Sequence, residues 1–226
     1  MIRLRDVRKS YPLGDQRVVA CDVGALEIAK GEQVALVGRS GTGKTTLLHI
    51  LAGILRPDTG EVEIAGVRLD QLGESARDRH RGRHIGMVYQ TFNLLQPFTA
   101  LENVLLGGLF GRGAGHAARA HAEQLLREVG LGDRLHHRPR ELSVGQVQRV
   151  AICRALINDP EVILMDEPLG NQDRTTGEQV LDLLLRLAAA GGKTVVMVTH
   201  DPSSARRMQR TVDLAALRRA TEGGAA

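Results

Sequence analysis

Aromatic side chains are scarce in this sequence of 226 residues, which has no tryptophan, two tyrosines and three phenylalanines. Proteins that bind single-stranded nucleic acids stack bases on aromatic rings, so this scarcity argues against that class. Long apolar runs are also missing. No stretch of 18 apolar residues is present, and the opening MIRLRDVRKSY has no apolar segment like that of a signal peptide. We therefore expect a cytoplasmic protein that binds no nucleic acid.

Cysteine is nearly absent too. Cys21 and Cys153 are too few and too far apart in the sequence for a disulfide framework or a metal cluster, and we expect both to be ordinary buried side chains. The formal net charge of +4 is compatible with nucleotides, other polyanions or a membrane surface as neighbours and does not choose among them. The chain is long enough to bury a substantial core.

Hydrophobic patterning predicts strands that alternate with helices. Apolar and polar residues alternate through the first 30 residues, for example in VVACDVGALEI, as they do in half-buried antiparallel strands. Further predicted strands are QVALVG, EVEIAG, HIGMVYQ, EVILMDE and KTVVMVTH, and predicted helices are TTLLHILAGIL and TTGEQVLDLLLRLAAAGG. Short apolar runs separated by helices indicate a parallel sheet covered on both faces.

A glycine-rich loop joins the predicted strand QVALVG to the helix after it. Residues 38–45, GRSGTGKT, match G-x-x-x-x-G-K-[ST] in full. Gly41 and Gly43 let backbone N–H groups wrap phosphates, Lys44 reaches the outer phosphate oxygens, and the Thr45 hydroxyl can ligate Mg²⁺. The alternative is a plain glycine-rich turn before a core helix. The nucleotide-binding residues predicted here are Gly38, Arg39, Ser40, Gly41, Thr42, Gly43, Lys44, Thr45 and Thr46.

Polar residues end three other predicted strands. Asp166 and Glu167 end VILMDE, where Asp166 can hold Mg²⁺ through water and Glu167 can orient or deprotonate an attacking water. His200 ends VVMVTH, and Gln90 ends GMVYQ. Strand ends on one side of a parallel sheet meet where ligands bind, although single residues of this kind are often structural. The predicted catalytic residues are Glu167, His200 and Gln90, and the predicted metal ligands are Thr45, Gln90 and Asp166.

The stretch LSVGQ at 142–146 predicts a second phosphate-binding helix start. Ser143 precedes an apolar-periodic run and Gln146 follows three residues later, the spacing of a capping box. Free N–H groups at a helix N-terminus attract anions, and Gly145 lets the backbone come close to a ligand. One nucleotide hardly needs two such loops.

Taken together, GRSGTGKTT, MVYQ, LSVGQVQRVAICRAL, VILMDEP and VTHDP resemble the ATP-binding subunit of ABC transporters over nearly the whole chain. The resemblance implies an ATPase with ATP and Mg²⁺ as cofactors, working as a head-to-tail dimer with a second copy of itself. Ser143, Gly145 and Gln146 of each copy then contact the γ-phosphate held by the other. It also implies an integral membrane permease as partner, on the inner face of the cell membrane. By the same resemblance Tyr11 stacks on adenine and Asp173 lies in the loop through which the two active sites communicate.

The resemblance also implies a domain organisation. We expect one α/β domain, residues 1–226, with a P-loop NTPase parallel-sheet core, an N-terminal antiparallel β part and an inserted α-helical subdomain. Residues 1–90 and 159–226 form the two parts of the nucleotide-binding core, and residues 91–158 form the helical signature subdomain. The basic cluster RDRHRGRH at 77–84 could dock a partner or acidic lipid, but a solvated loop is favoured.

Longer stretches, RHIGMVYQTFNLLQPFTALENVLL and DEPLGNQDRTTGEQV, resemble the subgroup that serves lipoprotein release and macrolide export with FtsX-type permeases, the LolD/MacB type. Three departures stand out. Val144 replaces a glycine of the usual LSGGQ, Leu169 and Gln172 change the usual TGNLD, and the end of the chain lacks the family's usual final turn and strand. A valine at 144 is tolerable only if its φ stays negative.

Two other classes compete with a transport ATPase. A chromosome-handling ATPase with a related head carries long coiled coils between its P-loop and signature halves, and no heptad run exists here. A non-catalytic or slow regulatory nucleotide-binding subunit is suggested by the altered LSVGQ and LGNQD.

Overall fold

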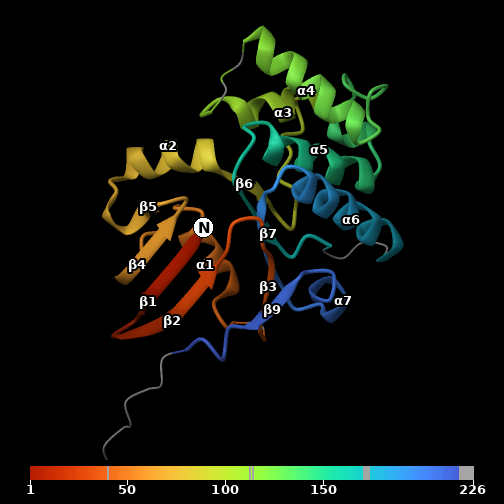
Figure 1. Ribbon diagram of the computed structural model, residues 1–226. Helices are drawn as coiled ribbons and strands as arrows, with labels where there is room; N and C mark the ends of the chain where they lie inside the picture. Colours follow the sequence, from red (N-terminus) through yellow and green to blue (C-terminus); the bar gives the residue numbers. More distant parts are fainter. Residues whose placement is uncertain (40, 112, 114, 170–173, 219–226) are drawn as a thin grey trace, which may run out of the picture.

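The computed structural model describes residues 1–39, 41–111, 113, 115–169 and 174–218. Two sheets lie next to each other, and a group of helices stands at one end of them (Figure 1). Within the described ranges no helix combines the length and the hydrophobicity that a membrane span requires.

The N-terminal sheet is antiparallel, as the alternating pattern predicts. Its strands are β1 (Ile2–Leu13), β2 (Gln16–Ile28), β4 (Thr59–Ile64) and β5 (Val67–Arg68), in the order β2-β1-β4-β5. Gly14, with φ 59°, and Asp15 form the two-residue turn of the β1–β2 hairpin. Ile2 and Leu4 are buried whereas Arg3 is exposed, so one face of this sheet packs on the core.

The second sheet is entirely parallel, in the order β6-β7-β8-β3-β9. Its strands are β3 (Gln33–Val37), β6 (Ile85–Val88), β7 (Val162–Asp166), β8 (Thr194–Thr199) and β9 (Arg210–Asp213). Successive side chains point to opposite faces. On β7, Val162 and Leu164 pack in the core shared with the antiparallel sheet, while Ile163 and Met165 join the core against α6 (Arg174–Ala190). Burial on both faces explains the continuous apolar runs.

The parallel strands bring the predicted site residues to one edge. β3 leads into the glycine-rich loop and α1 (Lys44–Leu51), while β6, β7 and β8 run toward Gln90, Glu167 and His200. All four strands point the same way, so their carboxyl ends lie along a single edge of the sheet.

The helical group is made of α3 (Ala100–Gly108), α4 (His116–Glu128) and α5 (Val144–Leu156), which share a core of their own. These helices lie within residues 91–158, the span of predominantly helical periodicity. Thr99 caps α3 through a capping box with Glu102. The short 3₁₀ helices η1 (Leu69–Gln71) and η2 (Pro139–Glu141) complete the connections.

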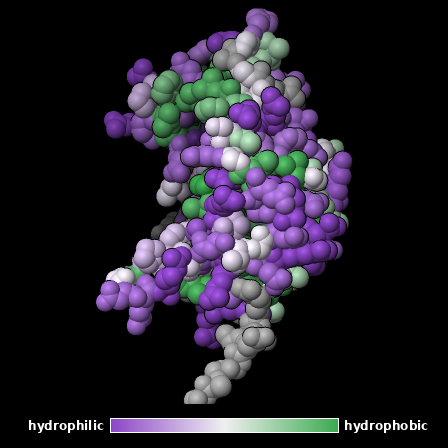
Figure 2. Space-filling model, turned by 90° about the vertical axis from the view of Figure 1, so that its left-hand side faces the viewer, coloured by the Kyte–Doolittle hydropathy of each residue, from purple (hydrophilic) through white to green (hydrophobic). Residues whose placement is uncertain are grey.

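The basic cluster forms a helix, so the solvated-loop expectation for 77–84 is wrong. Helix α2 (Glu74–His84) buries His80, whose ring stacks on that of His84 with centroids 4.5 Å apart, and His84 Nδ1 lies 2.8 Å from Glu161 Oε1. Arginine, alanine and glutamate are good helix formers, but α2 has no apolar stripe to reveal it. The face of the molecule on the α2 side is largely hydrophilic, with hydrophobic side chains gathered toward the helical group (Figure 2).

The end of the described chain also differs from expectation. A short helix, α7 (Pro202–Ala205), is capped by the Asp201 carboxylate, and β9 then adds a strand parallel to β3. The expectation that no strand ends the chain is therefore wrong. Polar and charged residues make up most of β9, so its sequence lacks the apolar run typical of a central strand.

The buried amide of Asn103 generates a stability prediction. Its Oδ1 accepts from the Leu95 N–H at 2.8 Å, and its Nδ2 donates to the carbonyls of Leu95, Phe98 and Thr99. Asn103→Leu leaves these groups buried without partners, which should lower the free energy of unfolding by about 2–4 kcal/mol. Urea denaturation checks this. Gln124→Leu, at an exposed position on α4, is the control and should stay within about 0.5 kcal/mol of the parent.

Candidate functional site

The glycine-rich loop is held in shape by close backbone contact. Gly43 has φ 90°, and a Cβ placed there would lie 1.9 Å from the Ala20 carbonyl oxygen of β2. Only glycine fits, because both the backbone angle and the neighbouring backbone exclude a side chain. Lys44 Nζ donates to the carbonyls of Gly38 at 2.8 Å and Arg39 at 3.1 Å, and Thr42 Oγ1 also donates to Arg39. Ser40 lies outside the described residues.

A pair of hard oxygen ligands lies beside this loop. Thr45 Oγ1, on the first turn of α1, is 3.4 Å from Asp166 Oδ1 at the end of β7. Burial raises the pKa of the Asp166 carboxyl, and the Thr45 hydrogen bond opposes that shift. Hydroxyl and carboxylate oxygens are the ligands that Mg²⁺ prefers, and an ion there would relieve the desolvation of Asp166. This end of the site therefore fits Mg²⁺.

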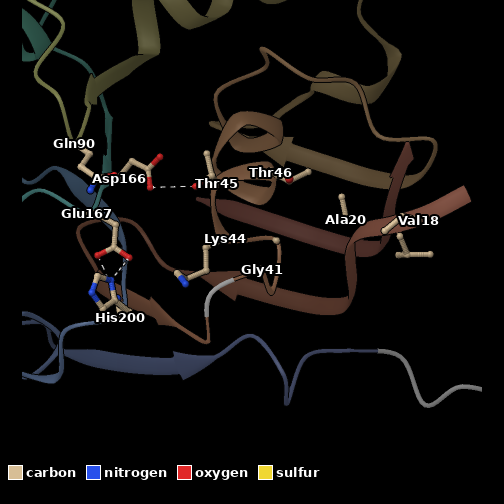
Figure 3. Close-up of a pocket in the computed structure, with 12 residues that line it drawn as sticks. Val18, Ala20, Gly41, Lys44, Thr45, Thr46, Gln90, Asp166, Glu167 and His200 are labelled. Carbon is tan, nitrogen blue, oxygen red and sulfur yellow. Dashed lines mark hydrogen bonds and ion pairs between the residues drawn. The ribbon is translucent and has the colours of Figure 1, made fainter. Parts of the chain in front are cut away.

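The carboxylate of Glu167 is anchored by residues at the end of β8. It accepts hydrogen bonds from Thr199 Oγ1 at 3.1 Å and from the His200 backbone N–H at 3.2 Å. Its Oε1 also lies 2.7 Å from His200 Nδ1 (Figure 3). An ionised carboxylate only accepts, so Nδ1 of His200 carries the proton of this bond. The Glu167 backbone has φ 43°, a left-handed conformation that surrounding contacts must hold in place.

These groups open onto one cavity of about 500 Å³ (Figure 3). The loop lysine, the Thr45–Asp166 pair and the Glu167–His200 pair converge on it from β3, β7 and β8, and Gln90 reaches it from β6. The predicted residues that line it are Gly41, Gly43, Lys44, Thr45, Thr46, Gln90, Asp166, Glu167 and His200. Gly38, Arg39 and Thr42 do not line the cavity but shape the loop through the bonds to Lys44 and Arg39.

The LSVGQ residues do not line this cavity. Ser143 caps α5, with the Gln146 N–H donating to Ser143 Oγ at 3.3 Å and the Ser143 N–H donating to Gln146 Oε1 at 2.9 Å, which is the predicted capping box. Val144 is the first residue of the helix, is 58% exposed and has a negative φ, so it fits without strain. Gly145 is tightly packed, since a Cβ there would lie 2.8 Å from Thr176 Cγ2 of α6.

Two further predicted residues are not placed at the cavity. Tyr11 lies on β1, 40% exposed, with the Lys9 ammonium 5.8 Å from the centre of its ring. It does not line the cavity, but its partner across the hairpin, Val18, does. Asp173, together with Gln172, lies outside the described residues.

Several residues at or near the site carry no signal in the sequence. Val18, Val19 and Ala20 line the cavity from β2, where the pattern indicates only an alternating strand. Arg154 of α5 donates to the carbonyls of Phe92 and Asn93 at 2.5 and 2.6 Å, just after Gln90. Phe92 and Asn93 have φ of 56° and 48°, and burial lowers the pKa of Arg154. An arginine in an apolar helix does not by itself reveal such long-range contacts with carbonyls.

Comparison with known sequences gives relatives that match along nearly the whole chain. A family model described as ABC transporter matches residues 22–170. The lipoprotein-releasing system ATP-binding protein LolD of Pseudomonas fluorescens is 47% identical over 214 residues, which cover 95% of this chain and 94% of the relative. An uncharacterized ABC transporter ATP-binding protein of Thermotoga maritima is 48% identical over 201 residues, which cover 89% of this chain and 86% of the relative.

Solved structures agree with these relatives. The dimeric structure of a post-hydrolysis state of the ATP-binding cassette MJ0796, bound to ADP and Pi, has a TM-score of 0.85 at 40% identity and covers 96% of this chain and 94% of its own. A dimeric structure of MJ0796, a bacterial ABC transporter cassette, also has a TM-score of 0.85, at 41% identity, with 94% of each chain covered. The expected α/β fold class is thereby confirmed.

Lys44 supplies a direct test of phosphate binding. Among the described residues of the loop, Lys44 is the charged one that lines the cavity. Charge-assisted bonds contribute about 1.5–3 kcal/mol. Lys44→Ala should therefore weaken ATP binding by about ten- to a hundredfold, measured by titration with a fluorescent ATP analogue. Lys30→Ala, at an exposed position, is the control and should bind as the parent does. Unchanged affinity in Lys44→Ala would contradict the loop assignment.

Proposed function

The chain belongs to the ABC transporter family, as a subunit that binds and hydrolyses ATP, and from this premise we propose how its residues divide the work. In this proposal Mg²⁺ and ATP occupy the cavity of about 500 Å³, two copies close on two nucleotides, and the closing motion drives an FtsX/MacB-type permease. Residues 1–90 and 159–226 serve as the nucleotide-binding core, and residues 91–158 as the signature subdomain.

The phosphates bind at the glycine-rich loop. Gly41 and Gly43 leave the backbone free to approach them, and α1 directs its N-terminus at the same point. Lys44 now bonds two carbonyls of its own loop, so its ammonium is already oriented beside the cavity. The adenine base of ATP extends toward β2. There Val18 offers an apolar surface, and Tyr11, across the hairpin, offers an aromatic one.

Thr45 and Asp166 would hold Mg²⁺, with Gln90 at its margin. The metal, when bound, neutralises charge on the phosphate oxygens. The protein's part is to present two oxygen atoms from different elements, α1 and β7, that would hold the ion beside the bound phosphates.

Glu167 acts as the general base, and its bonding to His200 and Thr199 is the observation that carries the proposal. Water attacks the γ-phosphorus, Glu167 takes a proton from that water, and the bond from phosphorus to the β-phosphate oxygen breaks to release ADP. His200 keeps the carboxylate in place and leaves its second ring nitrogen free to accept a hydrogen bond from water. Gln90, at the end of the neighbouring strand β6, lines the same cavity and would orient the same water.

The second copy explains the two helix starts. Ser143, Gly145 and Gln146 do not line the cavity of their own chain, yet the start of α5 has the chemistry of an anion site. In a head-to-tail dimer each α5 faces the γ-phosphate held by the other copy, and both solved structures of MJ0796 are described as dimeric. ATP then adds contacts that exist only in the closed dimer, and hydrolysis removes them.

A membrane permease is the second proposed protein partner, after the second copy of this chain. Between α2, α3 and α5 lies a groove of about 210 Å³, lined by Arg81, Tyr89, Leu106 and Phe110 among others, and Phe110 is 75% exposed. This mixture of apolar and basic side chains fits a helix of the permease, which would keep the subunit on the cytoplasmic face of the membrane. The LolD relatives, named for lipoprotein release, support an FtsX/MacB-type permease. The transported substrate would contact the permease.

Replacement of the base should trap the dimer. Glu167→Gln preserves shape and keeps ATP bound but removes the proton acceptor, so phosphate release should fall by at least about a hundredfold. The protein should then run as a monomer without ATP and as a dimer with it, in size-exclusion chromatography with light scattering. A monomer under both conditions, with ATP bound, would contradict the dimer.

Ser143 separates a phosphate site from a simple helix cap. Placed in the Glu167→Gln background, Ser143→Ala should leave the ATP affinity of the dilute monomer unchanged but reduce the ATP-induced dimer, because each closed site loses a charge-assisted bond of about 1.5–3 kcal/mol. A cap alone would cost about 1 kcal/mol of stability and spare the dimer.

The matched control is Thr99→Ala in the same background, since Thr99 caps α3 through the same kind of capping box. Both variants should lower the thermal midpoint, and only Ser143→Ala should reduce dimerisation. If the two variants dimerise equally well, α5 does not bind the partner's phosphate.

A further inference from the structure

Helix α5 reaches the catalytic turn through a side chain that the proposed function does not use. Gln148, only 2% exposed, donates from Nε2 to the carbonyl oxygen of Pro168 at 2.7 Å. Pro168 is the residue directly after Glu167. Gln148 Oε1 is also buried, and it accepts no hydrogen bond from the part of the chain that the structure describes. The amide is thus committed to one contact, with the backbone next to the general base.

The backbone at Glu167 needs such a contact. Its φ of 43° is unusual for a non-glycine residue, and a residue before proline is further restricted, since the ring disfavours helical backbone angles there. On one side the turn is held by β8, because the Glu167 N–H donates to the Val198 carbonyl and the carboxylate is bonded by Thr199 and His200. On the other side it is held by Gln148. The conformation of the base therefore depends on α5 as well as on the sheet.

The same helix begins at the predicted phosphate contacts. Gly145 and Gln146 lie within one turn of Gln148, and a helix rises only about 1.5 Å per residue, so the helix start and the amide move as one rigid piece. Gly145 also packs on Thr176 near the start of α6. Helix α5 thus contacts the chain both before and after residues 170–173. The hydrogen bond from Gln148 to Pro168 thus links the N-terminal end of α5 to the turn that carries Glu167.

We propose that Gln148 is a positioning residue that couples the phosphate-contacting end of α5 to Glu167 of the same chain. The inference rests on the proposed head-to-tail dimer, in which α5 of one copy touches the nucleotide of the other. A γ-phosphate held by the partner then fixes the position of α5. Through Gln148, α5 in turn fixes the turn at Pro168 and the general base Glu167 in the cavity of its own chain. Hydrolysis in one cavity thereby depends on occupancy of the other.

The test replaces the amide by a thioether of similar length, Gln148→Met. We expect kcat for ATP hydrolysis at saturating ATP to fall by at least about tenfold, because small errors in the position of a base are costly. KM and the affinity for ATP should stay within about twofold of the parent, since the phosphate loop is untouched. The Hill coefficient of the rate against ATP concentration should fall toward one. In the Glu167→Gln background, Gln148→Met should still dimerise with ATP.

Gln33→Met is the matched control. Gln33 is another buried glutamine, whose Nε2 donates to the Leu185 carbonyl at 3.3 Å, and it lies at the start of β3, the end away from the phosphate loop. It should lower the thermal midpoint to a similar degree with kcat unchanged. If Gln148→Met does not fold, Gln148→Asn keeps a polar amide in the site but is too short for the bond, and it should show the same loss of kcat.

The outcomes separate the two proposals. A Glu167→Gln protein that stays monomeric with ATP overturns the dimer and the coupling together. A Glu167→Gln protein that dimerises, alongside a Gln148 variant with the kcat and Hill coefficient of the parent, overturns the coupling alone. Equal losses of kcat in the Gln148 and Gln33 variants would also overturn it, because they would reflect stability only.

Discussion

Parallel pairing of β7, β8 and β3 sets the distances between the groups that we propose bind phosphate and metal. Asp166 pairs with Val198, and Val37, just before the glycine-rich loop, pairs with Thr199. The Asp166 carboxylate, the turn at His200 and the glycine-rich loop are therefore at nearly the same height on adjacent strands, whose spacing is about 4.8 Å. Everything else at the site is added to this edge. β6 brings Gln90, β2 closes the end of the cavity where we propose that adenine binds, and α5 holds the turn after Glu167.

Much of this arrangement could be predicted because it depends on local sequence patterns, such as apolar runs and the spacing of capping residues. The continuous apolar runs identify the parallel strands β3, β6, β7 and β8. Polar residues at the carboxyl ends of these strands must then meet along one edge of the sheet. Ser143 and Gln146 predict their capping box by spacing alone, and the structure contains it. Val144, an apparent defect in the signature, keeps a negative φ and fits a helix start, so the altered sequence does not disturb the local backbone. Roles for these residues stay predictions, since they depend on nucleotide and partner.

Other features have no local pattern. Helix α2 is polar nearly all round and has no apolar stripe, and it is anchored to the rest of the molecule by the buried His80 and by His84, which lies 2.8 Å from Glu161. The short β9 is held by pairing with β3 and needs no apolar run of its own. Arg154 and Gln148 donate to carbonyls, and a carbonyl can belong to any residue type. The sequence therefore carries no complementary partner for either side chain, and long-range contacts of this kind emerge only from the folded chain.

The contact between Gly43 and the Ala20 carbonyl has an evolutionary consequence. One partner is a glycine that nothing can replace, but the other is a backbone oxygen, which any residue at position 20 supplies. Selection for this contact can therefore fix position 43, whereas position 20 is limited only by the cavity that its side chain lines. What β2 must conserve is its register on β1. Insertions at the hairpin tip around Gly14 leave that register intact up to Ala20. A single inserted residue between Ala20 and the end of β2 would shift the oxygen away and loosen the seat of the phosphate loop, even with every motif residue still present.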